Sequence, residues 1–257
     1  MTNDSPADVV SVEDYLARGG KLSVPDNASP RYRAELLRLM SSFVDSELAG
    51  SAGFADSINW APGIQERIAA SRIVLEKADH AGRVLDLMGD FGTDKARYNQ
   101  VHHWSERVAR NAKFDPQQRQ GGDMRLSVFH YPLEDWTDAV VMNVLMGLAT
   151  GIQLKELVQC SYAPLADVLR QIAPREQRHM ELGLEGLGHI VATDGGRERA
   201  RACVAYWRPR VAETFGAAKS ERFERLQRMG LRHRANETLQ AAWQTAVSGQ
   251  LARLALA

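Results

Sequence analysis

The sequence predicts an all-α protein with four long helices at its core. Its long apolar patterns follow the helical period, and no alternating run closed by an Asn-Gly or Asp-Gly turn suggests a hairpin. Proline and glycine stand at the ends of these patterns, where helices begin and end. No repeat, low-complexity tract or linker separates them, so we expect one domain.

The N-terminal segment differs from the rest of the chain. Residues 1–28 are polar and contain Pro6 and Pro25, which predicts a loosely ordered arm with one short helix near 12–18. Residues 29–257 are then expected to form a single helical domain.

The first two core helices are bounded by proline and glycine. The first begins after Ser29, with Pro30 at the first helical position, and is expected to end at Gly50. The second follows Pro62 and ends near Gly89. A further helix is expected over 93–110, before a Gln- and Gly-rich loop over 117–122.

The other two core helices have similar start signals. Tyr131-Pro132 is expected to open the third, and Tyr162-Ala163-Pro164 the fourth, which Asp194-Gly195-Gly196 ends. The apolar stretch 139–152 is shorter than the roughly 20 residues of a membrane span, so it predicts a buried core helix. Two or three more helices complete the chain.

The composition narrows the class of protein. The 257 residues include 32 Lys and Arg against 32 Asp and Glu, a net charge of zero, which argues against a nucleic-acid or membrane-surface partner. Cys160 and Cys203 are too few for a disulfide scaffold and lack metal-finger spacing. The low cysteine count and an N-terminus without the pattern of a secretory signal together predict a cytoplasmic protein.

Charged residues fall on helix faces that should be buried. Glu47 continues the apolar stripe of Met40 and Val44, so it needs a cation, a metal or a proton if it is buried. The alternative is that Glu47 lies near the helix end and faces water. Lys77 and His80 share one arc of the second core helix, and for His80 alone a hydrogen-bonded core histidine is the alternative.

The fourth core helix carries Glu176 and His179 as a Glu-x-x-His pair that faces inward. Two such pairs and two further carboxylates form the ligand set of dinuclear iron and manganese helical bundles. Carboxylate and imidazole donors together suit iron or manganese.

The chain resembles the ferritin-like family of phenylacetyl-CoA epoxidase subunits, and the catalytic subunit more than the structural one. The resemblance covers about 31–216 and rests on short motifs in the same order and spacing: Ser46-Glu47-Leu48-Ala49-Gly50, Ala61-Pro62, His80, Tyr131-Pro132 with Trp136-Thr137-Asp138, Cys160-Ser161-Tyr162-Ala163-Pro164, Glu176 with His179, Trp207-x-Pro209 and Phe215-Gly216. It implies a ferritin-like four-helix bundle core with additional helices. By position it marks Glu47, His80, Glu176 and His179 as metal ligands.

Two family carboxylates are missing. Lys77 stands three residues before the first ligand histidine, where the catalytic subunit has a glutamate, and Gly147 aligns with the carboxylate of the third core helix. Glu76 could swing in to replace the first, and Asn143 could supply a neutral oxygen near the second. A single metal on the surviving ligands is another possibility.

The resemblance implies a non-heme iron oxygenase or oxidase of the diiron type with an altered site. One or two iron ions, or manganese, would activate O2 to oxidise an organic substrate, with an acyl-CoA as one candidate, and a separate reductase would supply electrons. Lys77 would then donate a proton, its pKa lowered by burial and the metal. A homodimer or a paralogous partner subunit is expected.

The alternative is a non-catalytic scaffold subunit, in which the Lys77 ammonium bridges Glu47 and Glu176 in place of metal. A metal-storage protein is a third, weaker class. The arginine-rich stretch 197–210 is either a phosphate site for a CoA thioester or, as its interleaved acids favour, a salt-bridged surface helix.

Overall fold

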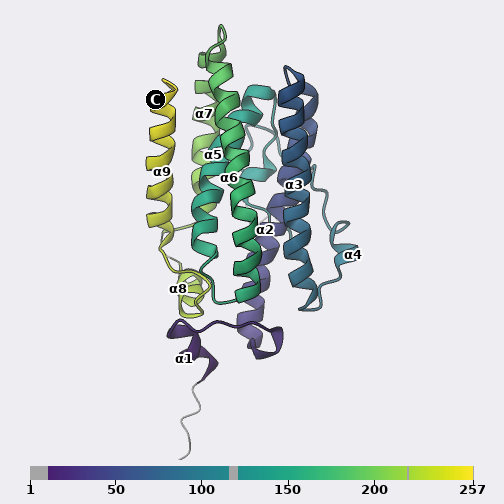
Figure 1. The fold of residues 1–257 in the computed structure, drawn as a ribbon, viewed down its shortest axis with the longest axis vertical. Helices are drawn as coiled ribbons and strands as arrows, with labels where there is room; N and C mark the ends of the chain where they lie inside the picture. The colour runs from purple at the N-terminus through teal and green to yellow at the C-terminus, as the bar shows by residue number, and fades with distance from the viewer. Residues whose placement is uncertain (1–10, 116–120, 219, 257) are drawn as a thin grey trace, which may run out of the picture.

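The computed structural model describes residues 11–115, 121–218 and 220–256. Its core consists of four long helices that lie side by side along the molecule (Figure 1): α2 (Pro30–Ser57), α3 (Ile64–Gly89), α5 (Trp136–Leu157) and α6 (Ala163–Val191). α2 packs on α3, α5 packs on α6, and α3 meets α6 between the two pairs. The prediction of an all-α fold with a four-helix core is confirmed.

Further helices surround this core. α7 (Gly196–Ala212) and α9 (Asn236–Arg253) pack on α5 at the side of the bundle away from α3 (Figure 1). The remaining short elements are α1 (Val12–Ala17), η1 (Pro25–Asn27), η2 (Ile58–Trp60), α4 (Lys95–Tyr98), η4 (Ser127–His130), η5 (Glu213–Phe215) and α8 (Glu221–Arg228).

α5 is the central helix of the molecule. By length and apolar composition alone it could cross a membrane, but 61% of its most apolar window is buried inside the protein. The indole of Trp243 in α9 is fully buried and donates to the carbonyl of Leu145 in α5. α5 therefore occupies the position predicted for a buried core helix, while a cytoplasmic location stays a prediction.

Side-chain caps set several helix ends. The Ser29 hydroxyl accepts a hydrogen bond from the Tyr32 amide, so α2 begins at Pro30 as expected. α5 begins at Trp136, later than predicted, because Asp135 caps it by accepting from the Asp138 amide. α6 ends before Gly195, whose φ of +69° favours glycine.

The predicted end of the first core helix at Gly50 is wrong, since α2 continues to Ser57. An added Cβ at Gly50 would lie 3.3 Å from the Phe129 ring and 3.4 Å from the Lys77 side chain. The glycine therefore permits close packing rather than ending the helix.

The predicted helix over 93–110 is also wrong, because only Lys95–Tyr98 is α-helical there. The buried guanidinium of Arg125 donates to the carbonyls of His103, Trp104 and Glu106. These carbonyls thus accept hydrogen bonds from the Arg125 side chain, which lies later in the chain, rather than from backbone amides in the helical i to i+4 pattern. Most of the loop predicted over 117–122 lies outside the described residues.

Part of the predicted N-terminal arm packs on the bundle. Leu16 and Leu22 are buried, the Leu22 amide donates to the Ser161 carbonyl at 2.7 Å, and the Ala163 amide donates to the Leu22 carbonyl at 2.8 Å. These contacts hold residues 11–28 at the start of α6. The division into an arm and one domain stays a prediction, and residues 1–10 lie outside the described residues.

A buried aspartate ties the loop before η4 to α2. Asp45 accepts from the Tyr98 hydroxyl and the Met124 amide, each at 2.7 Å, and burial raises the pKa of Asp45 to about 6. The unfolded chain binds this proton less tightly, with an aspartate pKa of about 4. Asp45 therefore contributes most stability below about pH 4, and this contribution is lost as the pH rises through 6.

We expect Asp45→Asn to change the pH dependence of stability. From pH 4 to pH 7, the free energy of unfolding of the variant should gain roughly 2 kcal/mol relative to wild type, because the amide cannot ionise. Urea unfolding across this range measures the difference. Asp167→Asn, at an exposed position, is the control. Parallel profiles for wild type and Asp45→Asn would contradict the expectation.

Candidate metal centre

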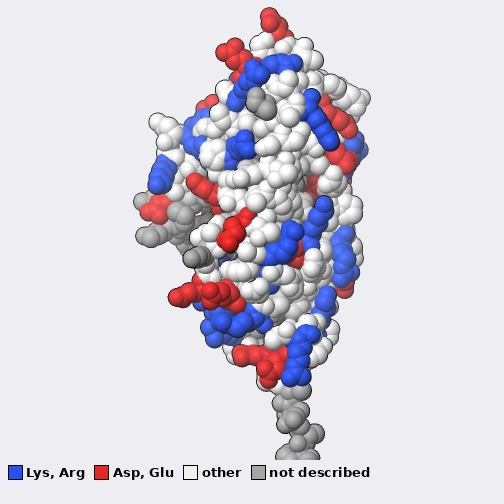
Figure 2. Space-filling view, turned by 90° about the vertical axis from the view of Figure 1, so that its left-hand side faces the viewer, with Lys and Arg blue, Asp and Glu red and all other residues white. Residues whose placement is uncertain are grey.

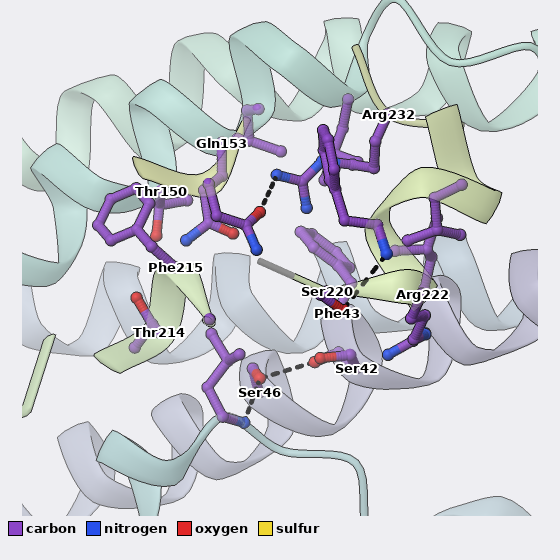
Figure 3. A pocket seen from close by; sticks show the side chains of 18 of the residues that line it. Ser42, Phe43, Ser46, Thr150, Gln153, Thr214, Phe215, Ser220, Arg222 and Arg232 are labelled. Atoms are coloured by element: carbon purple, nitrogen blue, oxygen red, sulfur yellow. Dashed lines mark hydrogen bonds between the residues drawn. The ribbon is translucent and has the colours of Figure 1, made fainter. Parts of the chain in front are cut away.

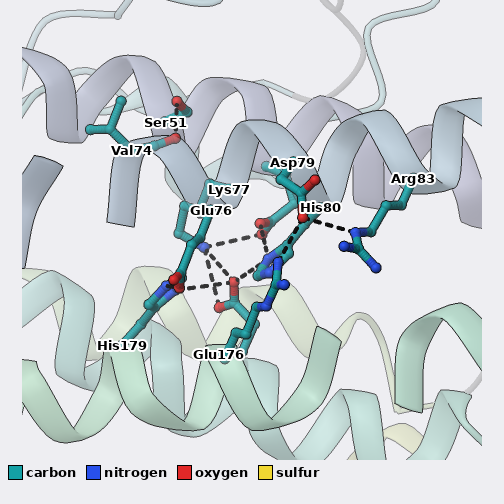
Figure 4. Close-up of polar contacts among 11 residues, drawn as sticks. Ser51, Val74, Glu76, Lys77, Asp79, His80, Arg83, Glu176 and His179 are labelled. Atoms are coloured by element: carbon teal, nitrogen blue, oxygen red, sulfur yellow. Dashed lines mark hydrogen bonds and ion pairs between the residues drawn. The ribbon is translucent and has the colours of Figure 1, made fainter. Parts of the chain in front are cut away.

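Five of the side chains singled out in the sequence meet in the middle of the bundle, and Figure 4 labels four of them, Lys77, His80, Glu176 and His179. The five come from α2, α3 and α6, and all are buried: Glu47, Lys77, His80, Glu176 and His179. Glu47 is 5% exposed, so the alternative in which it faces water is excluded. The helical period thus correctly identified the inward faces of all three helices.

The Lys77 ammonium lies among carboxylate oxygens from two other helices. Its Nζ is 3.1 Å from Glu47 Oε1 and 3.2 Å from both oxygens of Glu176. All three side chains are less than a tenth exposed. Lys77 therefore joins α3 to α2 and to α6 through one buried cation.

His80 faces the same two carboxylates. Its Nδ1 lies 2.9 Å from Glu176 Oε1 and 3.3 Å from Glu47 Oε2, and its Nε2 is buried without a hydrogen-bond partner. Glu47, His80 and Glu176 each offer one donor atom, and these atoms lie within 4.8 Å of one another. This three-donor group is where the residues present could hold a metal ion.

The second histidine is oriented by Glu76. His179 Nε2 lies 2.6 Å from Glu76 Oε2, while its Nδ1 lies 3.3 Å from Glu176 Oε1 without hydrogen-bond geometry. The Glu76 side chain is 26% exposed, so it stands at the outer edge of the cluster. Glu76 thus contacts His179 and is not one of the three grouped donors, so its role as a replacement ligand that swings in stays a prediction.

The pKa shifts describe a group of paired charges. Burial opposes the charged form of Lys77, but the carboxylates of Glu176 and Glu47 outweigh it and raise the Lys77 pKa. Burial likewise opposes protonation of His80, but its hydrogen bonds to Glu176 and Glu47 raise the His80 pKa above 6.5. Without a metal, the two anions beside the ammonium thus outweigh burial, and a Lys77 pKa lowered by a bound metal stays a prediction.

Glu176 is held as a carboxylate. Burial would raise its pKa, yet the charge of Lys77 and the contacts with His179 and His80 outweigh burial and lower the Glu176 pKa well below 4.5. The carboxylate therefore contributes stability above the pKa of the unfolded chain, about 4.3, and loses it only as the pH falls through its lower folded value.

The position of the second missing carboxylate is filled by apolar packing. An added Cβ at Gly147 would lie 2.7 Å from the Met180 Cβ, so no longer side chain fits without displacement. Asn143, the proposed neutral replacement, donates from Nδ2 to the His179 carbonyl at 2.9 Å and does not enter the three-donor group.

The residues present do not fit a pair of divalent ions. Two such ions carry four positive charges, and the cluster offers the carboxylates of Glu47 and Glu176 beside a third cation, Lys77. One ion on Glu47, His80 and Glu176 has enough donors, but it would share its carboxylate oxygens with the Lys77 ammonium. A metal ion at this centre would therefore lie beside the Lys77 ammonium, whose charge opposes its binding.

The arginine-rich stretch of α7 is held by the chain itself. Arg199 pairs with Asp135 at 2.8 Å, and Arg197 donates to the Leu254 carbonyl at 3.0 Å. On the face that includes α9, basic and acidic side chains are interspersed (Figure 2). These contacts favour the salt-bridged helix over a phosphate site.

A pocket of about 300 Å³ reaches Glu47 between α2 and α5 (Figure 3). Leu126, Phe129 and described residues within 214–236 complete the lining, and the sequence did not implicate this wall segment. Arg232 of this wall segment and Gln153 of α5 are among the lining residues. The sequence did not predict Gln153 and Arg232 as pocket residues. A single glutamine and an arginine between helices do not form a spacing pattern that is typical of a ligand site.

Comparison with known proteins places the chain in a family. A family model described as phenylacetic acid catabolic protein matches residues 20–257, which include all four core helices and the whole centre. No curated protein matches the chain. The four-helix core agrees with the ferritin-like bundle expected of this family. The chain belongs to the phenylacetic acid catabolic protein family.

Proposed function

We propose that this protein is a non-catalytic, structural subunit of a multi-subunit assembly that acts in phenylacetate catabolism. The observation that carries the proposal is the position of Lys77, whose Nζ lies within 3.2 Å of three carboxylate oxygens from Glu47 and Glu176. A cation thus already occupies the place where a metal would bind these carboxylates.

The charges of the centre support this reading. When His80 carries a proton, the two cations Lys77 and His80 balance the carboxylates of Glu47 and Glu176. Such a group joins α2, α3 and α6 as a structural metal would, without metal. Removal of one member would leave an uncompensated buried charge, which is strongly destabilising.

A partner subunit is part of the proposal. Ile64, Ile68 and Leu75 share one face of α3, and they are 66%, 50% and 70% exposed. Large apolar side chains gathered on one face are typical of contact surfaces. We therefore place the contact with a paralogous subunit on this face of α3.

Metal analysis tests the proposal. Protein from cells grown with added iron and manganese should contain well below one equivalent of either metal, and EDTA should leave its melting temperature unchanged. Lys95→Met, which removes an exposed lysine, is the matched control for handling and folding. One equivalent of tightly held metal would overturn the structural role and favour a mononuclear site, and two would indicate ligands beyond the three-donor group.

The second candidate is the oxygenase or oxidase function, favoured by the three donor atoms of Glu47, His80 and Glu176 within 4.8 Å. A bound iron would supply reductive activation of O2. Glu47, His80 and Glu176 would hold it beside the Lys77 ammonium, whose charge opposes its binding. Oxygen consumption by iron-reconstituted protein with a chemical reductant tests this candidate: turnover above that of free iron supports it, and none counts against it.

A further inference from the structure

The pocket beside Glu47 has polar groups that the centre does not use. We propose that it binds an amphipathic monocarboxylate, with the carboxylate at Gln153 and Arg232 and an apolar tail among Phe43, Phe129 and Met146. This inference does not depend on whether the centre holds a metal. It requires only the pocket and the charges around its wall.

The shape of the pocket suits such a ligand. Its volume of about 300 Å³ is at the small end of the range for small-molecule sites. Phe43 on α2, Phe129 after the loop and Met146 on α5 give it apolar walls. Glu47 also lines it, and the contact with Lys77 offsets the charge of that carboxylate.

Two buried nitrogen atoms at the pocket lack a hydrogen bond, although Arg232 Nε faces Glu156 Oε1 at 3.8 Å and the Arg232 guanidinium also donates from Nη2 to Asn236 Oδ1 at 3.3 Å. Gln153 Nε2 and Arg232 Nε are both without a hydrogen bond, and Figure 3 shows these residues on one side of the pocket, across from Ser42 and Ser46. Unpaired buried donors are costly and rare in folded proteins. A carboxylate satisfies such donors well because it only accepts hydrogen bonds.

The wall segment also carries more positive than negative charge in its ion pairs. Each of its two carboxylate partners faces two guanidinium groups: Glu35 faces Arg222 at 2.9 Å and Arg225 at 3.6 Å, and Glu156 faces Arg232 at 3.8 Å and Arg234 at 3.6 Å. Burial lowers the pKa of Arg232, and nearby Arg222 adds to that effect while Glu156 opposes it. The net charge of the whole chain is zero, but the wall segment has a local excess of positive charge. One bound anion would reduce this excess.

Calorimetric titration of the full-length protein with sodium octanoate tests the site, with 1-octanol and octanoyl-CoA as parallel probes. Octanoate should bind, and octanol should bind at least roughly tenfold more weakly, since it lacks the charged acceptor. No binding of octanoate, or equal affinity for octanol, would overturn the proposal. Binding of octanoyl-CoA without octanoate would also overturn it, because the anion recognised would then be that of the coenzyme.

Variants locate the site. Gln153→Leu keeps the volume and removes an unpaired donor, so it should leave the ligand-free melting temperature unchanged or higher and weaken octanoate binding roughly tenfold. Met146→Trp should fill the pocket and abolish binding of acid and alcohol alike. Gln244→Leu, on the exposed face of α9, should change neither affinity. Unchanged octanoate affinity in both pocket variants would place the binding elsewhere and refute this site.

Discussion

Replacing Lys77 with methionine is expected to lower the free energy of unfolding by about 3–5 kcal/mol. The side chain keeps a similar length, but the buried carboxylates of Glu47 and Glu176 lose the ammonium between them. A buried charge left without its partner loses the attraction that had offset its desolvation. In a protein of this size, the melting temperature should fall by on the order of 10 °C.

Chemical denaturation in EDTA measures this effect without contribution from metal. The control is Lys95→Met, which removes a 2.8 Å ion pair between Lys95 and Asp86. The side chains of these two residues are 51% and 70% exposed. The free energy of unfolding of this control should stay within about 0.5 kcal/mol of the wild-type value. Adding Glu47→Gln and Glu176→Gln to Lys77→Met should recover much of the lost stability, because no unpaired carboxylate then remains there. A variant Lys77→Met as stable as wild type would show that the ammonium does not hold the centre together.

Replacing Lys77 with glutamate should make the stability of the protein depend on metal. The substitution exchanges the cation for a third carboxylate, so in EDTA the variant should be less stable than Lys77→Met. A divalent ion could then bind the introduced carboxylate together with Glu47, His80 and Glu176. Saturation at 100 times the dissociation constant would restore about 2.7 kcal/mol.

Titration with Co²⁺ or Mn²⁺, followed by melting temperature and by Co²⁺ absorption, measures the gain. Wild type should show neither the stabilisation nor the absorption band, because its Lys77 ammonium competes for the same oxygens. The further variant Lys77→Glu with His80→Phe is the control, since it lacks the imidazole ligand and should bind the metal more weakly. Equal metal stabilisation of wild type and Lys77→Glu would contradict the view that Lys77 takes the place of metal.

Much of the centre could be predicted because helical periodicity is a local property. Lys77 and His80 lie one turn apart, as do Glu176 and His179, and the apolar neighbours of each pair identified its inward face. The same pattern indicated that Glu47 continues a buried stripe. It could not show whether the first core helix ends near Glu47, which would leave this side chain in water, or continues beyond it. That depends on the close packing of Gly50 against Phe129.

Distances within the centre are not local. Glu47 and Glu176 are far apart in sequence, and only the packing of α2, α3 and α6 brings both to Lys77. The pairing of His179 with Glu76 likewise depends on where α3 meets α6. The family resemblance could align these residues, but it could not determine which atoms face one another.

The sequence by itself determined the all-α class, the four core helices and the inward faces that carry the ionisable residues, since these follow from spacing along the chain. The tertiary structure decided that the Lys77 ammonium lies between two carboxylates, that Met180 fills the space at Gly147 and that the loop after Tyr98 is not helical. Each of these depends on contacts between segments distant in sequence, where side-chain packing and the pairing of buried charges outweigh local preference.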